Sequence, residues 1–423
     1  MLLWFLLCFF ALILIGVPVA FSLGITMFIL LATMTSLPPL LVPQQMVIGA
    51  DNFSLIAVPF FMLAAEIMSS GGITRRLVDF LNGLIGWITG GLALVNIAAS
   101  MLMAGLSGSS VADASMMGSM LIPAMKQKGY TPEYSAAVTA TSSTVGIIIP
   151  PSIPMIVLGS IAGISVIKLF AGGMIPGILV GGSLLLVAYI TSRIAKYPRE
   201  ERVSLRILWQ RMLETFWALL LPLIVLGGIL GGVMTVTEAS TVAVVYALIV
   251  SVFIYREITW KSFYSAVIRA ALTSSAVMLI VAAASGMAWL LTSNQVPQSL
   301  AANLQAMTSS AVIFLLLVNI FLLLVGSVMD LTAALLVLGP ILLPVAMRYG
   351  IDPIHFGVIM VTNLAIGLVT PPVGSCLYLT VPFAGVPVTR IIRATTPFLL
   401  AEIAVLFLIT YFPWLVTFVP SLF

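Results

Sequence analysis

The feature that most constrains this chain is a series of long apolar segments joined by short polar connections. A bilayer core of about 30 Å is crossed by about 20 apolar residues in a helix, and in lipid only helices and closed barrels satisfy their backbone hydrogen bonds. The alternating polarity that is typical of a membrane barrel is absent. Only 7% of the 423 residues are charged, against about 25% in soluble domains. We therefore predict an all-α polytopic membrane protein with segments at 1–15, 17–35, 54–71, 90–126, 133–163, 170–192, 215–233, 237–255, 265–291, 310–347, 353–385 and 396–419.

Basic side chains gather in one connection between apolar segments, which we place at 193–213. Its members are Arg193, Lys196, Arg199, Arg202, Arg206 and Arg211. The positive-inside rule assigns such a connection to the cytoplasm, and we prefer this to a nucleic-acid surface, so no nucleic-acid partner is expected. The first Lys or Arg of the chain is Arg75, so the first segments lack the basic start of a signal peptide. We expect residues 1–35 to form two short crossings, with one long tilted helix as the alternative.

Two segments are too long for a single crossing, and each contains a break near its middle. Segment 90–126 is interrupted by Ser-Gly-Ser-Ser at 107–110, and segment 310–347 by small and polar residues from Gly326 to Thr332. Two short helices that meet at a polar tip form a re-entrant hairpin. Such a tip is tolerated at membrane depth only inside protein or beside a water-filled cavity. We therefore predict two hairpins with buried polar tips.

Two further segments contain adjacent prolines. Segment 133–163 carries Pro150-Pro151, and segment 353–385 carries Pro371-Pro372. A proline pair removes two backbone donors and should break the helix. The carbonyl groups freed at such a break can coordinate a cation or a substrate.

An internal repeat links the two halves at an offset of 221 residues. Gly and Pro positions dominate the shared set, and both residues fix the shape of the backbone. The matched pairs are Gly118 and Gly339, Leu121 and Leu342, Pro123 and Pro344, Gly129 and Gly350, Pro132 and Pro353, Gly146 and Gly367, Pro150 and Pro371, Pro151 and Pro372, and Pro176 and Pro397. We divide the chain into a first repeat over 1–212 and a second over 213–423, each with a hairpin, a broken helix and a closing helix.

The distribution of charge then predicts the orientation of the repeats. We place the basic connection in the cytoplasm and count membrane crossings in both directions from it. Of the Lys and Arg residues in the loops, only Lys168 and Arg348 then lie outside the cell membrane. The charges placed inside are Arg75, Arg76, Lys126, Lys128, Arg256, Lys261, Arg390 and Arg393. The two hairpins then enter from opposite faces. This is the inverted-repeat architecture of secondary transporters, whose sites lie near the midplane.

Polar residues at the breaks are the candidates for a site. Ionisable residues inside a membrane cost roughly 2.5–3.5 kcal/mol on insertion scales. Asp113, just past the first tip, and Asp330, at the second, are therefore expected to form a site or to cap the tip helices, and these two roles are compatible. The hydroxyls and carbonyls of the first tip are hard oxygen ligands that suit a small cation. Further polar or small residues precede the Pro-Pro breaks: Thr144, Gly146, Asn363, Gly367 and Thr370. No phosphate-binding loop, metal-ligand cluster or catalytic set is present in the sequence, so we expect neither an enzyme nor a bound cofactor.

Two stretches resemble a known family. They are GLSGSSVADASMMGSMLIPAMKQKGYTPEYSAAVTATSSTVGIIIPPSIPMIVLG and DLTAALLVLGPILLPVAMRYGIDPIHFGVIMVTNLAIGLVTPPVG. Both look like the hairpins and following helices of the large membrane subunit, DctM-type, of tripartite ATP-independent periplasmic (TRAP) transporters. The resemblance implies an elevator-type transporter in the bacterial inner membrane. It also implies Na⁺ as the coupling ion and an organic acid as substrate, such as a C4-dicarboxylate, sialic acid or a sugar acid.

The same resemblance implies partners and site residues. The partners are a small four-helix membrane subunit, expected as a separate chain, and a periplasmic substrate-binding protein. A first Na⁺ site is carried onto Ser107, Ser110, Gly326, Gly367 and Thr370. A second Na⁺ site is carried less firmly onto Thr144, Gly146 and Asp330. We assign the substrate to Ser109, Asp113 and Asn363.

Other functions compete with this interpretation. A stand-alone cation-coupled carboxylate symporter of similar architecture is the main alternative. A channel is disfavoured by the two symmetric hairpins, and an intramembrane enzyme by the lack of a catalytic set. A non-transporting assembly scaffold gives no reason for two polar tips at membrane depth.

Overall fold

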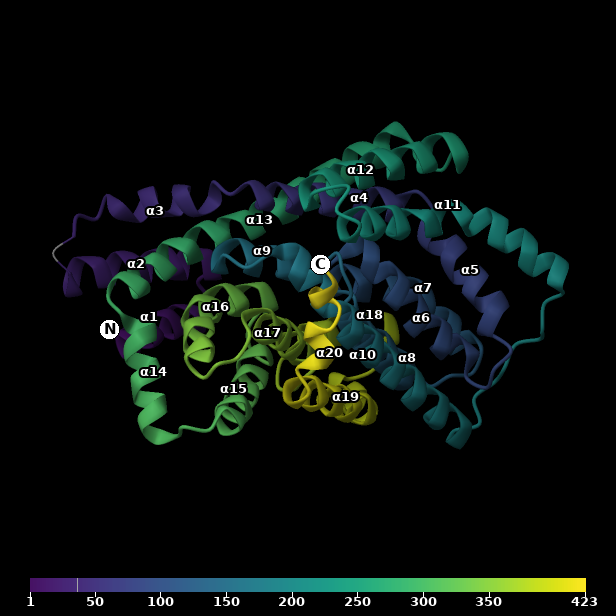
Figure 1. Ribbon diagram of the computed structural model, residues 1–423. Coiled ribbons are helices and arrows are strands. Elements are labelled where there is room, and N and C mark those ends of the chain that lie inside the picture. Colours follow the sequence, from purple (N-terminus) through teal and green to yellow (C-terminus); the bar gives the residue numbers. More distant parts are fainter. Residues whose placement is uncertain (36) are drawn as a thin grey trace.

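The computed structural model describes residues 1–35 and 37–423, and for residues 105–107 and 307 it describes the backbone alone. All regular elements in this described part are helical, as predicted (Figure 1). The first half contains α1 (Leu2–Leu14), α2 (Val19–Met34), α3 (Leu41–Ala50), η1 (Phe53–Ile56), α4 (Ala57–Ser70), α5 (Ile73–Ile85), α6 (Gly91–Ser107), α7 (Ser110–Gln127), α8 (Pro132–Val145), α9 (Ile153–Ala162) and α10 (Val166–Ile194). The second half contains α11 (Leu205–Leu230), α12 (Val236–Ile249), η2 (Val250–Ile254), α13 (Trp260–Ser293), α14 (Val296–Met307), α15 (Ala311–Gly326), α16 (Leu331–Arg348), α17 (Pro353–Gly367), α18 (Ser375–Ala384), α19 (Val388–Tyr411), α20 (Trp414–Thr417) and η3 (Pro420–Leu422).

Many of these helices suit a membrane. Within the described residues, 7 are long and apolar enough to cross a bilayer by themselves, and a bent pair formed by α14 and α15 would raise the number to 8. They are η1 with α4, α10, α11, α12 with η2, α13, α16 and α19. Shorter apolar helices, among them α9 and α18, lie between these spans. The predicted multi-pass all-α class is thus confirmed.

Both predicted hairpin tips occur where the sequence is broken. Helix α6 ends at Ser107 and α7 begins at Ser110, while α15 ends at Gly326 and α16 begins at Leu331. Gly108 has a φ of 57°, a left-handed conformation that glycine adopts without steric cost. The first tip therefore turns within two residues.

The Pro-Pro pairs also break their helices. Helix α8 ends at Val145 and α9 begins at Ile153, and in the second half α17 ends at Gly367 and α18 begins at Ser375. Both the Pro150-Pro151 and the Pro371-Pro372 bonds are cis. The starts of α7 and α16 are separated by 221 residues, as are those of α8 and α17. The inverted orientation of the two halves stays a prediction.

The two halves exchange helices. Helix α9 of the first half packs against α16, an arm of the second hairpin, while α18 packs against α7 and α8 of the first half. The closing helices α10 and α19 pack against each other, and α19 also contacts α8. We call α6–α10 with α15–α19 the hairpin core, because its members are interlocked in this way.

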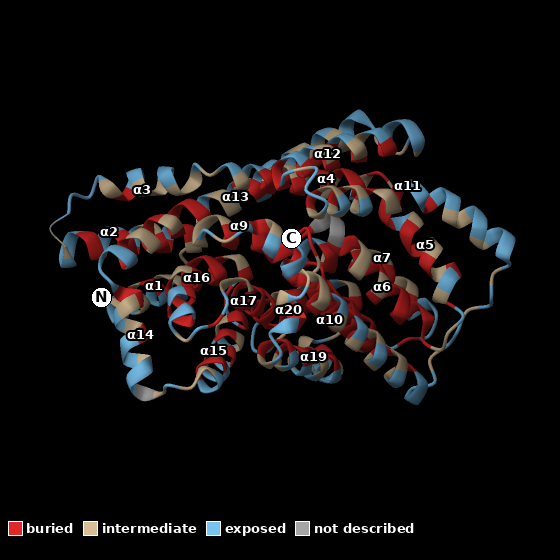
Figure 2. Cartoon of the chain, in the orientation of Figure 1, coloured by how far each residue is buried: buried red, intermediate tan, exposed pale blue. Residues whose placement is uncertain are grey.

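The centre of the hairpin core is formed by α8 and α17. Every residue from Tyr134 to Val145 and from His355 to Gly367 is buried, as the red colour along these helices shows in Figure 2. A helix that is buried on all sides lies inside a larger structure. The hydroxyls of α8 donate to carbonyls of their own helix, as Thr139 does to Ser135 O at 2.9 Å. These bonds offset the cost of burying polar groups.

A second group of helices lies along the hairpin core. Helix α13 packs against α2, α3 and α4, and α4 packs against α12; Figure 1 shows α13 below α3 and α4 below α12 in the upper part of the molecule. We call α2, α3, α4, α12 and α13 the frame. It contacts the hairpin core through the pairs α13–α16 and α4–α6.

Some details differ from the sequence-based prediction. The basic connection is shorter than 193–213, because α10 continues to Ile194 and α11 begins at Leu205. Arg206 and Arg211 are therefore helical, and the boundary drawn after residue 212 falls inside α11. Helices α3, α5 and α14 were not predicted. Their polar residues, such as Arg75 and Arg76 in α5, interrupt the apolar pattern without breaking the helix.

Candidate functional site

The first hairpin tip is held against the first Pro-Pro break. A Cβ atom added to Gly108 would lie 3.0 Å from the Pro151 carbonyl oxygen, so the tip and the break are in contact. Ser109 caps α7, because its hydroxyl accepts a hydrogen bond from Ala112 N at 3.4 Å. Ser110 is buried, and among the described residues its hydroxyl has no hydrogen-bond partner. Buried polar atoms normally have one, so Ser110 is a candidate ligand. The side chain of Ser107 lies outside the described residues.

The second tip is joined to the second Pro-Pro break by backbone hydrogen bonds. The Ser327 carbonyl accepts hydrogen bonds from Val373 N at 3.2 Å and from Gly374 N at 3.3 Å. Asp330 caps α16 by accepting from Thr332 N at 2.9 Å and from Ala333 N at 3.3 Å. The carboxylate of Asp330 is also exposed, so capping leaves part of it free to meet a ligand.

Gly326 and Gly367 come together at this second junction. A Cβ atom added to Gly367 would lie 2.5 Å from the Gly326 carbonyl carbon and 2.6 Å from its Cα. Thr370 belongs to the same turn, since its backbone N–H donates to the Gly367 carbonyl at 3.0 Å, and its hydroxyl donates to Ile366 O at 2.8 Å. The structure thus brings together three residues of the predicted first ion site. Ser110 lies on the other tip.

The residues of the predicted second ion site have separate partners. Thr144 donates a hydrogen bond of 2.6 Å to the carboxyl group of Glu402, which is fully buried in α19. Gly146 lies against the carboxyl group of Asp113, where an added Cβ atom would overlap it. Asp330 is on the second tip. Asp113 therefore packs against Gly146, and this contact connects the first hairpin with the first break.

The polar amide of Asn363 is used between helices. Its Nδ2 donates to the carbonyl oxygen of Asn319 at 3.0 Å and to its Oδ1 at 2.7 Å. Asn319 in turn donates to the Thr410 hydroxyl at 3.1 Å. This buried chain joins α15, α17 and α19. The described hydrogen bonds of Asn363 therefore connect neighbouring helices.

A cavity separates the two tips. We call it the tip cavity; it has a volume of about 210 Å³. Ser109 and Ser110 of the first tip line it together with Asp330 and Thr332 of the second. Ile147 and Leu368, which directly follow Gly146 and Gly367, are among the further residues that line it. Two tips that are far apart in the sequence therefore face one space, and hydroxyl and carboxylate oxygens at this space are donors that suit Na⁺.

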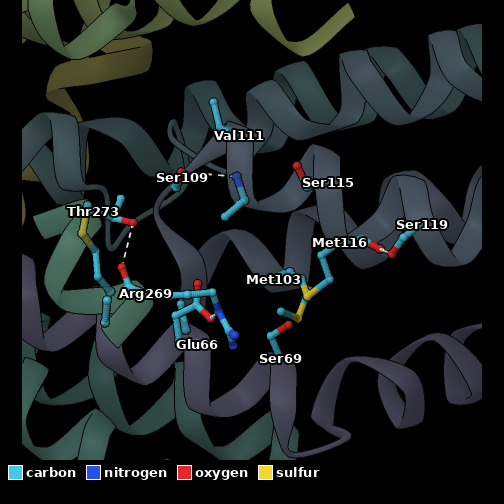
Figure 3. Close-up of a pocket in the computed structure, with 14 residues that line it drawn as sticks. Glu66, Ser69, Met103, Ser109, Val111, Ser115, Met116, Ser119, Arg269 and Thr273 are labelled. Carbon is cyan, nitrogen blue, oxygen red and sulfur yellow. Dashed lines mark hydrogen bonds and ion pairs between the residues drawn. The ribbon is translucent and has the colours of Figure 1, made fainter. Parts of the chain in front are cut away.

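A larger cavity of about 530 Å³ adjoins the tip cavity. We call it the lateral cavity. The two cavities share Met62, Ser109, Val111 and Thr273 as lining residues. Figure 3 shows the lateral cavity with an ion pair at its edge, formed by Arg269 Nε and Glu66 Oε2 at 2.8 Å.

Arg269, Glu66 and Glu402 were not among the site residues predicted from the sequence. The signal was present for all three, because ionisable residues inside apolar segments need a physical reason. Their partners lie 203 and 258 residues away in the chain. Such pairing is set by tertiary structure alone. Among the described residues, no group of three or more His, Cys, Asp and Glu side chains could hold a metal ion, so hydroxyl and carbonyl oxygens would have to join any carboxylate in an ion site.

Comparison with known proteins gives a consistent result. Residues 6–415 match the family model described as "Tripartite ATP-independent periplasmic transporter, DctM component". The C4-dicarboxylate TRAP transporter large permease protein DctM of Pseudomonas aeruginosa is 43% identical over 86% of this chain and 85% of its own length. The isethionate TRAP transporter permease protein DctMQ of Oleidesulfovibrio alaskensis is 40% identical over 96% of this chain, which spans 64% of that protein.

A solved structure shares the fold. The YdaH transporter of Alcanivorax borkumensis, described as having an unusual topology, superposes with a TM-score of 0.63 over 87% of each chain. The two sequences are only 16% identical, so this likeness concerns the fold alone.

Proposed function

Because this chain belongs to the DctM component family of tripartite ATP-independent periplasmic transporters, we propose that it is the membrane subunit that moves an organic acid inward, driven by Na⁺. Membership makes it a multi-pass membrane permease component for organic acids. The observation that carries the finer proposal is the tip cavity, where two polar hairpin tips face each other at a space beside the buried core. The substrates in the names of the two relatives, a C4-dicarboxylate and isethionate, are both organic acids.

Na⁺ is the proposed coupling ion because the breaks offer hard oxygen donors. Ser110 supplies a buried hydroxyl that needs a partner. The turn that contains Gly367 and Thr370, packed on Gly326, would supply carbonyl oxygens and a further hydroxyl. When bound, Na⁺ would contribute positive charge that offsets the charge of the acid. Asp330, exposed at the second tip, and Thr144 with Gly146 at the first break form the proposed second group.

The proposed transport step is a movement of the hairpin core along the frame. The core is interlocked by the exchange of α9 and α18, which favours its motion as one body. The lateral cavity lies between the two groups, since it is lined by α6 and α7 on one side and by α4 and α13 on the other. A substrate held at the tips would then travel with the core, as in an elevator mechanism.

The driving force is sufficient for this role. One charge that crosses about 100 mV supplies about 2.3 kcal/mol, and a tenfold Na⁺ gradient adds about 1.4 kcal/mol. Two Na⁺ ions would supply about 7 kcal/mol. Moving a monoanion inward against the membrane potential costs about 2.3 kcal/mol of this. The remaining free energy of about 5 kcal/mol allows an accumulation of a few thousandfold.

The proposed partners are a small membrane subunit and a periplasmic substrate-binding protein. The word tripartite in the family description supports two further components. The DctMQ relative is longer than the region that this chain matches, which leaves room in that relative for a second membrane component. For the present protein we propose such a component as a separate chain. The frame, with its exposed apolar side chains on α2 and α13, offers a surface for such a subunit.

Uptake into liposomes tests this function. The protein is reconstituted with its co-purifying membrane subunit, and labelled succinate, N-acetylneuraminate and gluconate are supplied with their binding proteins. We expect uptake of one acid class with an inward Na⁺ gradient and loss of that uptake when choline replaces Na⁺. Equal uptake in choline would refute sodium coupling. Full uptake by this chain alone, without a binding protein, would favour a stand-alone symporter.

A further inference from the structure

The lateral cavity is lined by both polar and apolar side chains. Its lining residues come from four helices, and they include apolar side chains such as Met62, Met103 and Met116 beside several hydroxyls. A volume of about 530 Å³ falls in the range of about 300–1,000 Å³ that is typical of small-molecule sites. Because it joins the tip cavity, a molecule in it would reach Ser109 of the first tip.

Arg269 is the only Lys or Arg that lines this cavity among the described residues. It lies nine residues after Trp260, the first residue of α13, which is about 14 Å along the helix at 1.5 Å per residue. Arg269 is thus four residues inside the apolar segment 265–291, where a charged side chain needs a partner or a functional reason. Half of its side chain, 51%, is exposed to the space around it.

The ion pair with Glu66 uses only one part of the guanidinium. Nε donates to Glu66 Oε2 at 2.8 Å, and Nη2 makes a long contact of 3.4 Å with the Ser70 hydroxyl. A guanidinium has five N–H donors in a fixed fork. Most of the N–H groups on its two terminal nitrogens therefore remain available. Glu66 therefore orients Arg269 without saturating it (Figure 3).

Hydroxyl groups continue from Arg269 toward the tip. On α7, Ser115 and Ser119 lie one turn apart, and they line the cavity together with Ser109, the N-cap residue of this helix. Thr273 lies one turn from Arg269 on α13 and bonds to its carbonyl at 2.9 Å. The lining of the cavity thus combines one guanidinium with several hydroxyl groups.

We propose that the lateral cavity binds the transported organic acid and that the terminal nitrogens of Arg269 receive its acidic group. The proposal rests on the proposed function, and it adds the residue that selects for anions. Arginine suits this role because its fork matches the two oxygens of a carboxylate. Glu66 is a positioning residue, and its negative charge weakens the binding of the acid enough to permit release.

Direct binding to the purified membrane complex tests the proposal. Isothermal titration measures succinate, N-acetylneuraminate, gluconate and isethionate in NaCl, with succinamide as an uncharged analogue of succinate. We expect an acid to bind to the wild-type protein and Arg269→Gln to raise its Kd at least tenfold. Arg269→Lys should raise the Kd less, because a single ammonium keeps the charge but loses the fork. Glu66→Gln, which retains an acceptor for Nε, should lower the Kd by several-fold.

A matched control removes the same charge elsewhere. Arg206→Gln alters an exposed arginine near the start of α11 that lines none of the cavities described above, and its Kd should equal that of the wild type. An unchanged Kd in Arg269→Gln, or equal binding of succinate and succinamide, would overturn the inference while leaving the transport function intact. If an acid is taken up but its binding in detergent is too weak to measure, an unchanged half-saturating concentration for uptake in Arg269→Gln is equally decisive. Failure of all four acids both to bind to the wild type and to be taken up would refute the inference and the transport function together.

Discussion

The contact between Gly326 and Gly367 leads to a quantitative prediction. In Gly367→Ala the new Cβ atom would lie 2.5 Å from the Gly326 carbonyl carbon, whereas ordinary contacts begin at 3.4 Å. Helices α15 and α17 must therefore separate by roughly 0.9 Å at this point. Overpacking of a core costs about 1–3 kcal/mol. We expect a value near the upper end, about 3 kcal/mol, because the opposing atoms belong to the main chain and cannot rotate away.

Thermal unfolding and transport measure the two consequences of this substitution. The melting temperature in detergent, followed by the fluorescence of the seven tryptophans, should fall clearly below that of the wild type. Na⁺-driven uptake should fall as well, since the second tip would be displaced. Gly182→Ala in α10 is the matched control, because nothing lies within 4 Å of its added Cβ atom. It should be neutral or stabilise by up to about 1 kcal/mol. Wild-type melting and uptake in Gly367→Ala would show that the close approach is not a constraint.

Three further predictions use other parts of the structure. A cysteine at position 350 should react with an impermeant label added outside intact cells, and one at 202 should not; the reverse pattern would contradict the inverted arrangement. Thr370→Ala should raise the Na⁺ concentration for half-maximal uptake without changing the affinity of the binding protein for its acid, and an unchanged Na⁺ dependence would remove Thr370 from the ion site. Thr144→Val should lower stability by about 1–3 kcal/mol, because it leaves the buried Glu402 without this hydroxyl donor; Glu402→Gln, which can still accept the bond, should lose less, and equal losses in the two variants would argue against the bond.

Local signals explain why the breaks of the fold could be predicted. Ser-Gly-Ser-Ser at 107–110 and the two Pro-Pro pairs determine backbone shape over a few residues, and the helices end within a few residues of them. Helices α3, α5 and α14 were not predicted because the prediction relied on long apolar segments, and these helices are short or carry polar residues. The start of α11 was placed ten residues late for the same reason, since Arg206 and Arg211 extend the helix beyond its apolar segment.

The site was harder to predict because its geometry depends on contacts between distant segments. The polar tips and the residues before the breaks were identifiable by type, and the structure places Gly326 beside Gly367. The partners of individual side chains were not identifiable. Asn363 bonds to Asn319, Thr144 to Glu402, and Arg269 to Glu66. Hydropathy and periodicity carry no information on such pairs, since any of several polar residues at similar depth could have met.

The exchange of α9 and α18 has a consequence for biogenesis. When the ribosome has completed the first half, α9 has not yet met α16, and the surfaces of α7 and α8 that will receive α18 are still bare. The nascent first half therefore lacks these helix contacts in the membrane. It stays incompletely packed until the last third of the polypeptide has been synthesised. Insertion and tertiary assembly are thereby separated in time. A chaperone or insertase that shields α7 and α8 during this interval would act on the most vulnerable species along the assembly route.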